Sequence, residues 1–250
     1  VSGSDIAFST ASGQPVRLVL RVSGGDSDVA IAFRTEDASL NRIWLRVPAE
    51  QNEHVWGGGE QMSYFDMRSR RFPLWTSEPG VGRDKTTEIT FKSDVTGKSG
   101  GDYWNTNYPQ PTYLSSRRYA LHVETTAYSA FDFRKDNFHE VEIWAVPERI
   151  EFTARPTFIA LVEAMAERFG RQPPLPDWVY GGAIIGLKDG ANSFDRLEAI
   201  IAAGTKVSAL WCEDWVGLRH TSFGARLFWD WKANDDRYPG LRQRIAELED

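Results

Sequence analysis

The sequence predicts an antiparallel β-sandwich followed by the first strands and helices of a parallel α/β domain. Up to about residue 150, apolar residues mostly alternate with polar ones between clusters of Gly, Asp, Asn and Ser, which is typical of short antiparallel strands. A proline-rich segment then interrupts the chain at 172–176. Beyond it, two apolar segments are each followed by a segment with helical spacing, which indicates a parallel sheet.

The N-terminal strands are short and are separated by turn residues, an arrangement that favours two antiparallel sheets packed face to face. Each predicted strand either alternates apolar and polar residues or forms a short apolar run. The clearest predicted strands lie at 16–22, 29–33, 87–91, 119–123 and 141–144.

An amphipathic helix is predicted at 158–169, between Thr157 and Gly170, because its apolar residues recur at helical spacing. The segment Gln-Pro-Pro-Leu-Pro at 172–176 makes a stiff, extended connector. We therefore divide the chain into a sandwich domain at 1–155, a helix with its proline-rich linker at 156–176, and an α/β region at 177–250.

The α/β region reads as strand, helix, strand and helix. We predict buried strands at 179–187 and 207–212, a first helix from the cap Ser193 to Gly204, and a second helix that begins at Pro239 and is still running at Asp250. Two such units leave a parallel strand edge uncovered, so we expect the chain to stop inside an eight-unit barrel or a doubly wound sheet.

Lys188 and Glu213 follow the two predicted parallel strands directly. Because functional side chains of α/β barrels stand at the carboxyl ends of the strands, we expect these two side chains to lie close together. They would form an ion pair or share one ligand hydroxyl. The alternative interpretation is a salt bridge that only anchors the loops.

Arg226 and Trp229 lie in the long loop after the second strand, three residues apart, so one helical turn or a tight loop would aim both at one point. A guanidinium group and an indole N–H are donors without acceptor capacity, and together they suit an anion with several oxygens. The alternative is that Trp229 and Trp231 are core aromatics and that Arg226 caps a helix end.

The composition argues against several classes of protein. A net charge of −6 is unsuited to binding nucleic acid or an anionic membrane, and no apolar run is long enough to cross a membrane. Cys212 is the only cysteine, fits a reducing compartment and is expected to be a small core residue. The histidines lack the spacing of metal ligands, so we predict no metal site; they are His54, His122, His139 and His220.

Longer motifs extend through most of the chain, at 58–66, 71–83, 105–113 and 211–229. The last contains Trp-Cys-Glu-Asp-Trp at 211–215 and Thr-Ser-Phe-Gly-Ala-Arg-Leu-Phe-Trp at 221–229. In this order, the motifs resemble the sulfoquinovosidases of glycoside hydrolase family 31, from about residue 55 to the end.

The resemblance implies a galactose-mutarotase-like β-sandwich followed by a catalytic (β/α)8 barrel. It also implies retaining hydrolysis of α-linked sulfoquinovose from glycerol conjugates, with a small sulfosugar glycoside as the partner and no cofactor. In the family, an arginine and a tryptophan grip the sulfonate, and they match Arg226 and Trp229. A Lys/Glu pair that holds the neighbouring sugar hydroxyl matches Lys188 and Glu213, which places the chain in the Lys/Glu subgroup.

The family's two catalytic aspartates have no counterpart before Asp250, so no catalytic residue is predicted in this segment and we expect the segment alone to be inactive. Glu60 and Asp214 are assigned to substrate or structural contacts. The alternatives are a family 31 α-glucosidase or α-xylosidase, or a non-catalytic sulfosugar-binding module. The expected location is the bacterial cytoplasm, and the oligomeric state is left open.

Overall fold

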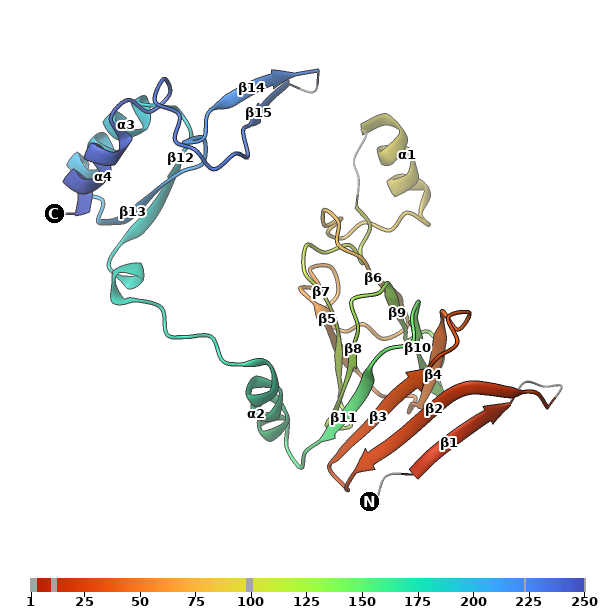
Figure 1. Cartoon of the computed structure of the whole chain (residues 1–250). Helices are drawn as coiled ribbons and strands as arrows, with labels where there is room; N and C mark the ends of the chain where they lie inside the picture. The colour runs from red at the N-terminus through yellow and green to blue at the C-terminus, as the bar shows by residue number, and fades with distance from the viewer. Residues whose placement is uncertain (1–3, 10–12, 98–100, 223, 250) are drawn as a thin grey trace. The chain divides into compact units, whose positions relative to one another are not determined.

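The computed structural model describes residues 4–9, 13–97, 101–222 and 224–249. The chain forms two compact units, Val1–Arg171 and Gln172–Asp250 (Figure 1). The boundary between the units coincides with the start of the proline-rich segment at 172–176.

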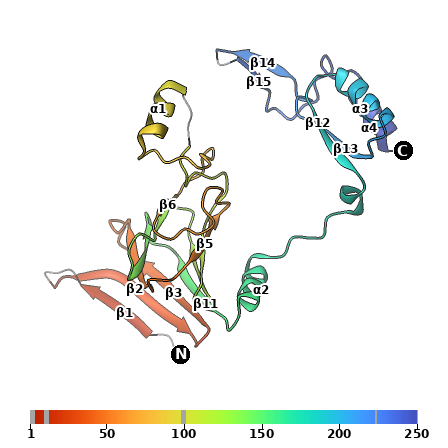
Figure 2. The same cartoon turned by 180° about the vertical axis from the view of Figure 1, so that it is seen from behind.

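The N-terminal unit contains two antiparallel sheets, as the sequence predicts (Figures 1 and 2). In the larger sheet the strand order is β1-β2-β3-β11-β8-β7-β5, and in the smaller sheet it is β4-β10-β9-β6. The strands of the larger sheet are β1 (Ser4–Ser9), β2 (Pro15–Gly24), β3 (Asp28–Thr35), β5 (Val55–Gly59), β7 (Pro109–Ser115), β8 (Tyr119–Glu124) and β11 (Arg149–Ala154). Those of the smaller sheet are β4 (Ile43–Pro48), β6 (Arg71–Leu74), β9 (Ser129–Asp132) and β10 (Phe138–Ile143).

The core of this unit lies between the two sheets. Strand β10 shows how the sequence produces it, because Val141 and Ile143 are fully buried while Glu140 and Glu142 alternate with them on the other face. The same alternation in the larger sheet buries aromatic and aliphatic side chains against them. The core members with no exposed surface include Val55, Phe72, Tyr113, Leu121, Val123, Phe131 and Ile150.

One predicted strand is wrong. The segment 87–91 begins a helix, α1 (Glu88–Gly97), because Thr87 acts as its N-terminal cap. The Thr87 side chain accepts a hydrogen bond from the amide of Thr90 at 3.4 Å, and the amide of Phe91 donates to the Thr87 carbonyl at 3.0 Å. Ile89 and Phe91 are exposed, so their alternation reflects no buried sheet face.

The predicted helix at 158–169 is confirmed as α2 (Phe158–Phe169). The Thr157 hydroxyl accepts from the amide of Ala160, and Gly170 ends the helix with a positive φ of 92°. Arg168 joins the helix to the larger sheet, since its guanidinium pairs with Glu124 at 2.5 Å and with Glu151 at 2.8 Å. Helix α2 therefore belongs to the N-terminal unit.

The C-terminal unit is built on a parallel pair of strands, β12 (Ala183–Leu187) and β13 (Val207–Cys212), joined by helix α3 (Asn192–Ala202). This strand–helix–strand order confirms the predicted parallel pairing. A short 3-10 helix η1 (Asp177–Tyr180) precedes β12, and the hairpin β14 (Leu218–Thr221) and β15 (Gly224–Leu227) follows β13. Helix α4 (Leu241–Glu249) is the last element.

Three details of this unit differ from the sequence prediction. The first strand starts at Ala183 rather than at 179, because the amide of Val179 donates to the Pro176 carbonyl and forms a helical turn there. Ser193 lies inside α3 and is fully buried, so it is not the helix cap. The loop after β13 contains a hairpin that the sequence did not predict.

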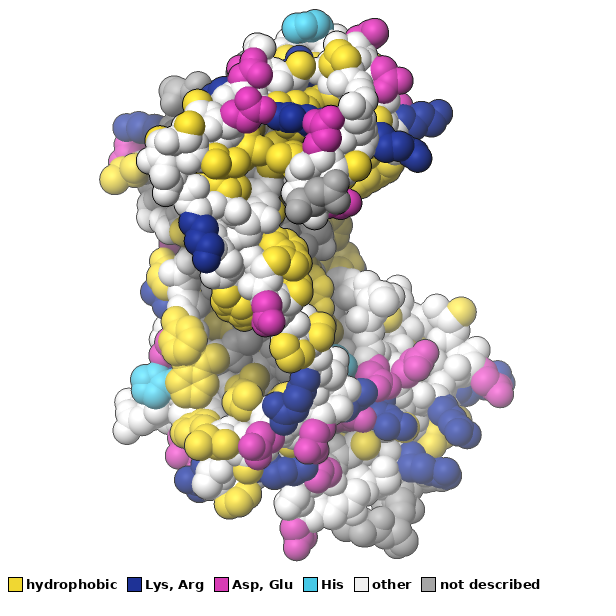
Figure 3. Space-filling view, turned by 90° about the vertical axis from the view of Figure 1, so that its left-hand side faces the viewer, with side chains coloured by type: hydrophobic (Ala, Val, Ile, Leu, Met, Phe, Trp, Pro, Cys, Tyr) yellow, Lys and Arg dark blue, Asp and Glu magenta, His cyan; other side chains and the backbone are white. Residues whose placement is uncertain are grey.

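The strands predicted to be buried carry exposed apolar side chains. In the described part of the chain, Ile184 of β12 is 50% exposed and Trp211 of β13 is 67% exposed. On the face drawn in Figure 3, hydrophobic side chains lie at the surface among charged ones. Among the described helices, none combines the length and the apolar character needed to span a membrane.

Candidate functional site

The carboxyl ends of β12 and β13 bring Lys188 and Glu213 together. Leu187 pairs with Cys212 in the parallel register, and the amide of Glu213 donates to the Leu187 carbonyl at 3.2 Å. The next side chains therefore meet, with Lys188 Nζ 3.6 Å from Glu213 Oε2. The sequence predicts this contact, because each of the two residues directly follows one of two neighbouring parallel strands.

The pair stands over a small hollow of about 300 Å³ that is also lined by Gly186, Leu187 and Trp211. Both charged side chains remain at least half exposed, so the pair adds little to stability and is open to a ligand. A larger hollow of about 1360 Å³ lies in the same unit, but mostly apolar side chains line it. The smaller one is the better candidate site because it presents a donor and an acceptor side by side.

Arg226 lies on the second strand of the hairpin, and Trp229 lies two residues after that strand ends. Arg226 belongs to β15, opposite Arg219 of β14, and its Nη1 donates to the Ala225 carbonyl at 2.9 Å. Trp229 is 68% exposed. Among the described contacts, none joins Arg226 to Trp229, so their convergence on one anion stays a prediction.

The tryptophans of this loop form a chain of ring contacts rather than a core. The ring of Trp229 lies 6.4 Å from that of Trp231, which lies 6.2 Å from that of Trp215. Both Trp229 and Trp231 are exposed, so neither is a core aromatic within the described residues. Their indole groups remain available for contact with a ligand.

Asp214 is buried and its carboxylate is held by other protein groups, so it makes structural contacts. It is 1% exposed, and its carboxylate accepts hydrogen bonds from the amide of Gly190 at 3.2 Å, from Arg237 Nε and from the Tyr238 hydroxyl. Burial alone would raise the pKa of Asp214, but the bonds from Tyr238, Arg237 and Gly190 outweigh it and lower the pKa. The Tyr238 hydroxyl also lies 3.3 Å from Ser193 Oγ.

The sequence pattern did not predict the contacts of Asp214 with Arg237 and Tyr238, and it assigned Ser193 to a helix cap rather than to a contact with Tyr238. Arg237 and Tyr238 follow Asp214 by 23 and 24 residues, a separation with no local periodicity. Cys212, expected in the core, is partly buried, and burial raises the pKa of its thiol.

In the N-terminal unit, Glu60 follows the three glycines at 57–59 that end strand β5, and its side chain is exposed. The amide of Glu60 donates to the Tyr108 carbonyl at 3.0 Å, and a Cβ at Gly59 would lie 2.0 Å from that oxygen. Gly59 thus permits the close approach of the end of β5 to the backbone just before β7. The backbone contact of Glu60 is therefore structural.

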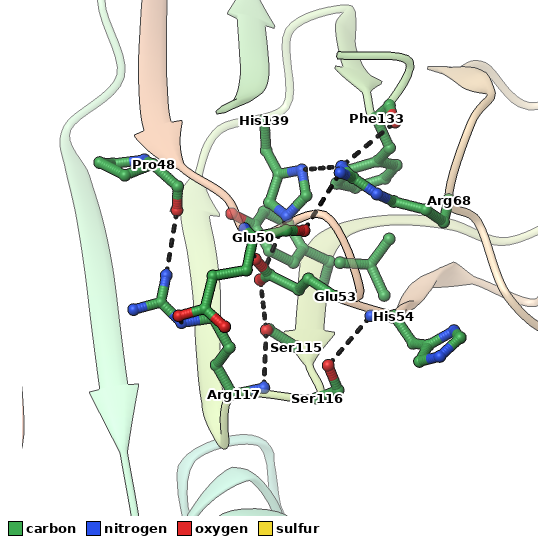
Figure 4. A network of polar contacts seen from close by, with 12 residues as sticks. Pro48, Glu50, Glu53, His54, Arg68, Ser115, Ser116, Arg117, Phe133 and His139 are labelled. Carbon is green, nitrogen blue, oxygen red and sulfur yellow. Dashed lines mark hydrogen bonds and ion pairs between the residues drawn. The ribbon is translucent and has the colours of Figure 1, made fainter. Parts of the chain in front are cut away.

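A second polar cluster lies inside the sandwich, around Glu53 (Figure 4). The Glu53 carboxylate accepts from the hydroxyls of Ser115 and Tyr119, and lies 3.1 Å from His139 Nε2. Arg68 Nη1 lies 3.3 Å from the other ring nitrogen of His139. Because Glu53, Ser115 and His139 are buried, this cluster holds strands together rather than meeting a substrate. No group of three or more potential metal ligands occurs among the described residues.

Comparison with known proteins identifies close relatives. The chain is 73% identical over 250 residues to a sulfoquinovosidase of Agrobacterium fabrum and 41% identical over 237 residues to a sulfoquinovosidase of Escherichia coli. It covers 37% and 35% of the lengths of these two proteins. No family model matches the chain.

Solved structures are similar to this chain in the same way as these relatives. A GH31 family sulfoquinovosidase from E. rectale, in complex with an aza-sugar inhibitor, superimposes with a TM-score of 0.87 and 48% identity, over 98% of this chain and 36% of that one. A Flavobacterium johnsoniae GH31 dextranase superimposes with a TM-score of 0.63 at 13% identity, over 98% of this chain and 29% of its own, and shows the fold alone. The chain is thus similar to sulfoquinovosidases over its whole length and spans about a third of theirs.

Proposed function

We propose that this chain is the sandwich and early catalytic-domain part of a sulfoquinovosidase, a retaining glycoside hydrolase that cleaves α-linked sulfoquinovose from glycerol conjugates. One structural observation carries the proposal most directly: Lys188 and Glu213, 3.6 Å apart, meet at adjacent strand ends over a small hollow. The 73% identity to a sulfoquinovosidase supports it.

The charges of the site suit a sulfonated sugar. A sulfonate is ionised at any cellular pH and offers three oxygens, which a guanidinium fork and an indole N–H can bind. Arg226 and Trp229 are assigned to that group. An isolated Glu213 would repel the sulfonate, and Lys188 offsets this charge while both hold the adjacent sugar hydroxyl.

The parallel β12–α3–β13 unit is assigned to the start of a (β/α)8 barrel. Its exposed apolar residues, such as Ile184 and Trp211, support this assignment because later strands and helices of a barrel would cover them. Retaining hydrolysis needs two carboxyl groups roughly 5–5.5 Å apart. We assign both to parts of the relatives that this chain does not span, so the chain alone is expected to be inactive.

The test compares Arg226→Lys with Arg219→Lys in the complete gene product that contains this chain. Arg219 lies opposite Arg226 on the same hairpin, which makes it a matched control. Lys keeps the charge but not the planar fork, so Arg226→Lys should lower kcat/KM for an aryl α-sulfoquinovoside by about 100-fold. Arg219→Lys should change it less than about threefold.

Other results of this experiment would favour one of the alternative functions. Equal hydrolysis of aryl α-glucoside or α-xyloside, with Arg226→Lys unaffected, would identify a family 31 glycosidase without sulfonate specificity. Binding of the sulfosugar without any hydrolysis would indicate a non-catalytic module. If the 250-residue chain alone released the aryl group, the assignment of both catalytic carboxyl groups to other parts of the protein would be wrong.

A further inference from the structure

Three separate segments of the C-terminal unit meet at the buried side chain of Asp214. They are the loop after β12 at Gly190, the loop after β13 at Asp214 itself, and residues 237–238 before α4. We infer that Asp214 is a positioning residue, which fixes Lys188 and Glu213 relative to each other and so sets the recognition of the sugar hydroxyl. This inference rests on the proposed function.

The carboxylate of Asp214 connects the loop that carries Lys188 with the loop that carries Glu213. Asp214 is the direct neighbour of Glu213, and its carboxylate accepts from the amide of Gly190, two residues after Lys188. The hydrogen bond therefore links the two loops that carry the candidate ligand-binding pair. Together with the backbone bond from Glu213 to Leu187, it fixes the spacing of the loops on both sides of the pair.

The ion pair of Lys188 and Glu213 is too weak to hold its own two loops in place. The side chains of Lys188 and Glu213 are 74% and 50% exposed, and 3.6 Å is near the outer limit of an ion pair. Exposed pairs of this kind impose little order on the backbone. The buried carboxylate beneath them has the opposite character, because Tyr238 is fully buried with it and Arg237 compensates its charge.

Backbone hydrogen bonds also connect this junction to the hairpin of β14 and β15. The Asp214 carbonyl accepts from the amide of Gly217 at 2.9 Å, and the Gly217 carbonyl accepts from the amide of Phe228 at 3.2 Å. The amide of Asn234 donates to the Trp215 carbonyl at 3.0 Å. The segment that carries Arg226 and Trp229 is thus held at both ends, at Gly217 and at Asn234, by hydrogen bonds to the backbone of Asp214 and Trp215.

The experiment uses the complete gene product and an aryl α-sulfoquinovoside. Asp214→Asn keeps the shape of the side chain but removes its charge and one acceptor, so the loops lose their common anchor. Because small displacements of substrate-holding groups cost large factors in binding, we expect KM to rise about tenfold with a smaller change in kcat. Glu53→Gln, at a buried carboxylate of the other unit, is the matched control and should lower Tm without raising KM.

A double-mutant cycle separates positioning from a general loss of stability. If Asp214 acts through the pair, Asp214→Asn should raise KM less than about threefold in a Lys188→Ala/Glu213→Ala background. An equal factor in both backgrounds, or a lower Tm with unchanged KM, would overturn the inference.

A second variant covers a folding failure of Asp214→Asn. Gly190 has a φ of +58°, and a Cβ there would lie 3.0 Å from the Arg237 carbonyl and 3.3 Å from its Cγ, so Gly190→Ala should push the Gly190 amide and the Arg237 segment apart while keeping the Asp214 carboxylate itself. It should reproduce the rise in KM, and an unchanged KM would count against the inference. A wild-type protein inactive on the sulfosugar would overturn the proposed function and the inference together, whereas an active wild type with insensitive variants would overturn only the inference.

Discussion

Glu53 keeps a negative charge in the interior of the N-terminal unit because donors surround it. Burial alone would raise the pKa of Glu53, but hydrogen bonds from His139, Ser115 and the amide of Glu50 outweigh it and bring the pKa from 4.5 to about 2. A carboxyl group whose pKa is lower in the folded state stabilises the fold at high pH. That contribution is complete above about pH 4.5 and is lost as the pH falls towards 2.

We therefore expect the chain to lose about 3 kcal/mol of stability from this group between pH 4.5 and 2, and Glu53→Gln to remove this part of the pH dependence. The variant should also have a lower Tm at neutral pH, because an amide cannot satisfy the same donors. Thermal unfolding followed by circular dichroism from pH 2 to 7 measures both effects. Glu60→Gln, at an exposed carboxylate, is the control, and an unchanged pH slope in Glu53→Gln would contradict the expectation.

At the residue scale, the sequence predicts what depends on local register and misses what depends on distant contacts. The meeting of Lys188 and Glu213 follows from counting to the ends of two parallel strands, and the structure shows it. The environment of Asp214 could not be foreseen in the same way. Its partners lie 23 and 24 residues away, and only the fold brings them together.

At the scale of elements, α2 illustrates how a few local signals define a helix. Apolar spacing, the cap at Thr157 and the stop at Gly170 all agree, and the predicted bounds match the observed ones. The segment at 87–91 was wrongly predicted as a strand because five alternating residues fit either a strand or the first turns of a helix. There the cap at Thr87 decided the outcome.

The cap of α2 can be tested directly. Thr157→Ala removes the acceptor for the amide of Ala160 and should lower the free energy of unfolding of the N-terminal unit by about 1 kcal/mol. Thr157→Ser keeps a hydroxyl acceptor and should retain most of this stability. Urea unfolding followed by circular dichroism provides the comparison, and equal losses in the two variants would show that the hydrogen bond is not the source of the effect.

At the scale of the whole molecule, the two units differ in how much apolar surface they bury. The N-terminal unit has a continuous core between two sheets, with Phe72, Tyr113 and Phe131 fully enclosed. Among the described hydrophobic residues of the C-terminal unit, those that are buried are Leu187, Leu197, Val216 and Tyr238. Since burial of apolar surface is the main source of folding stability, the N-terminal unit should be the more stable of the two.

Limited proteolysis of the 250-residue chain tests this difference. Arg171 is exposed at the boundary between the units, so trypsin should cut after it and leave a resistant N-terminal fragment that ends there. The exposed Lys and Arg residues of the C-terminal unit should be cleaved faster, because local opening is easier where fewer contacts are buried. Mass spectrometry over a time course identifies the fragments, and Arg171→Gln should abolish the boundary cut without protecting the C-terminal unit. A C-terminal fragment that outlasts the sandwich would mean that the small parallel unit is held by interactions stronger than its buried surface suggests.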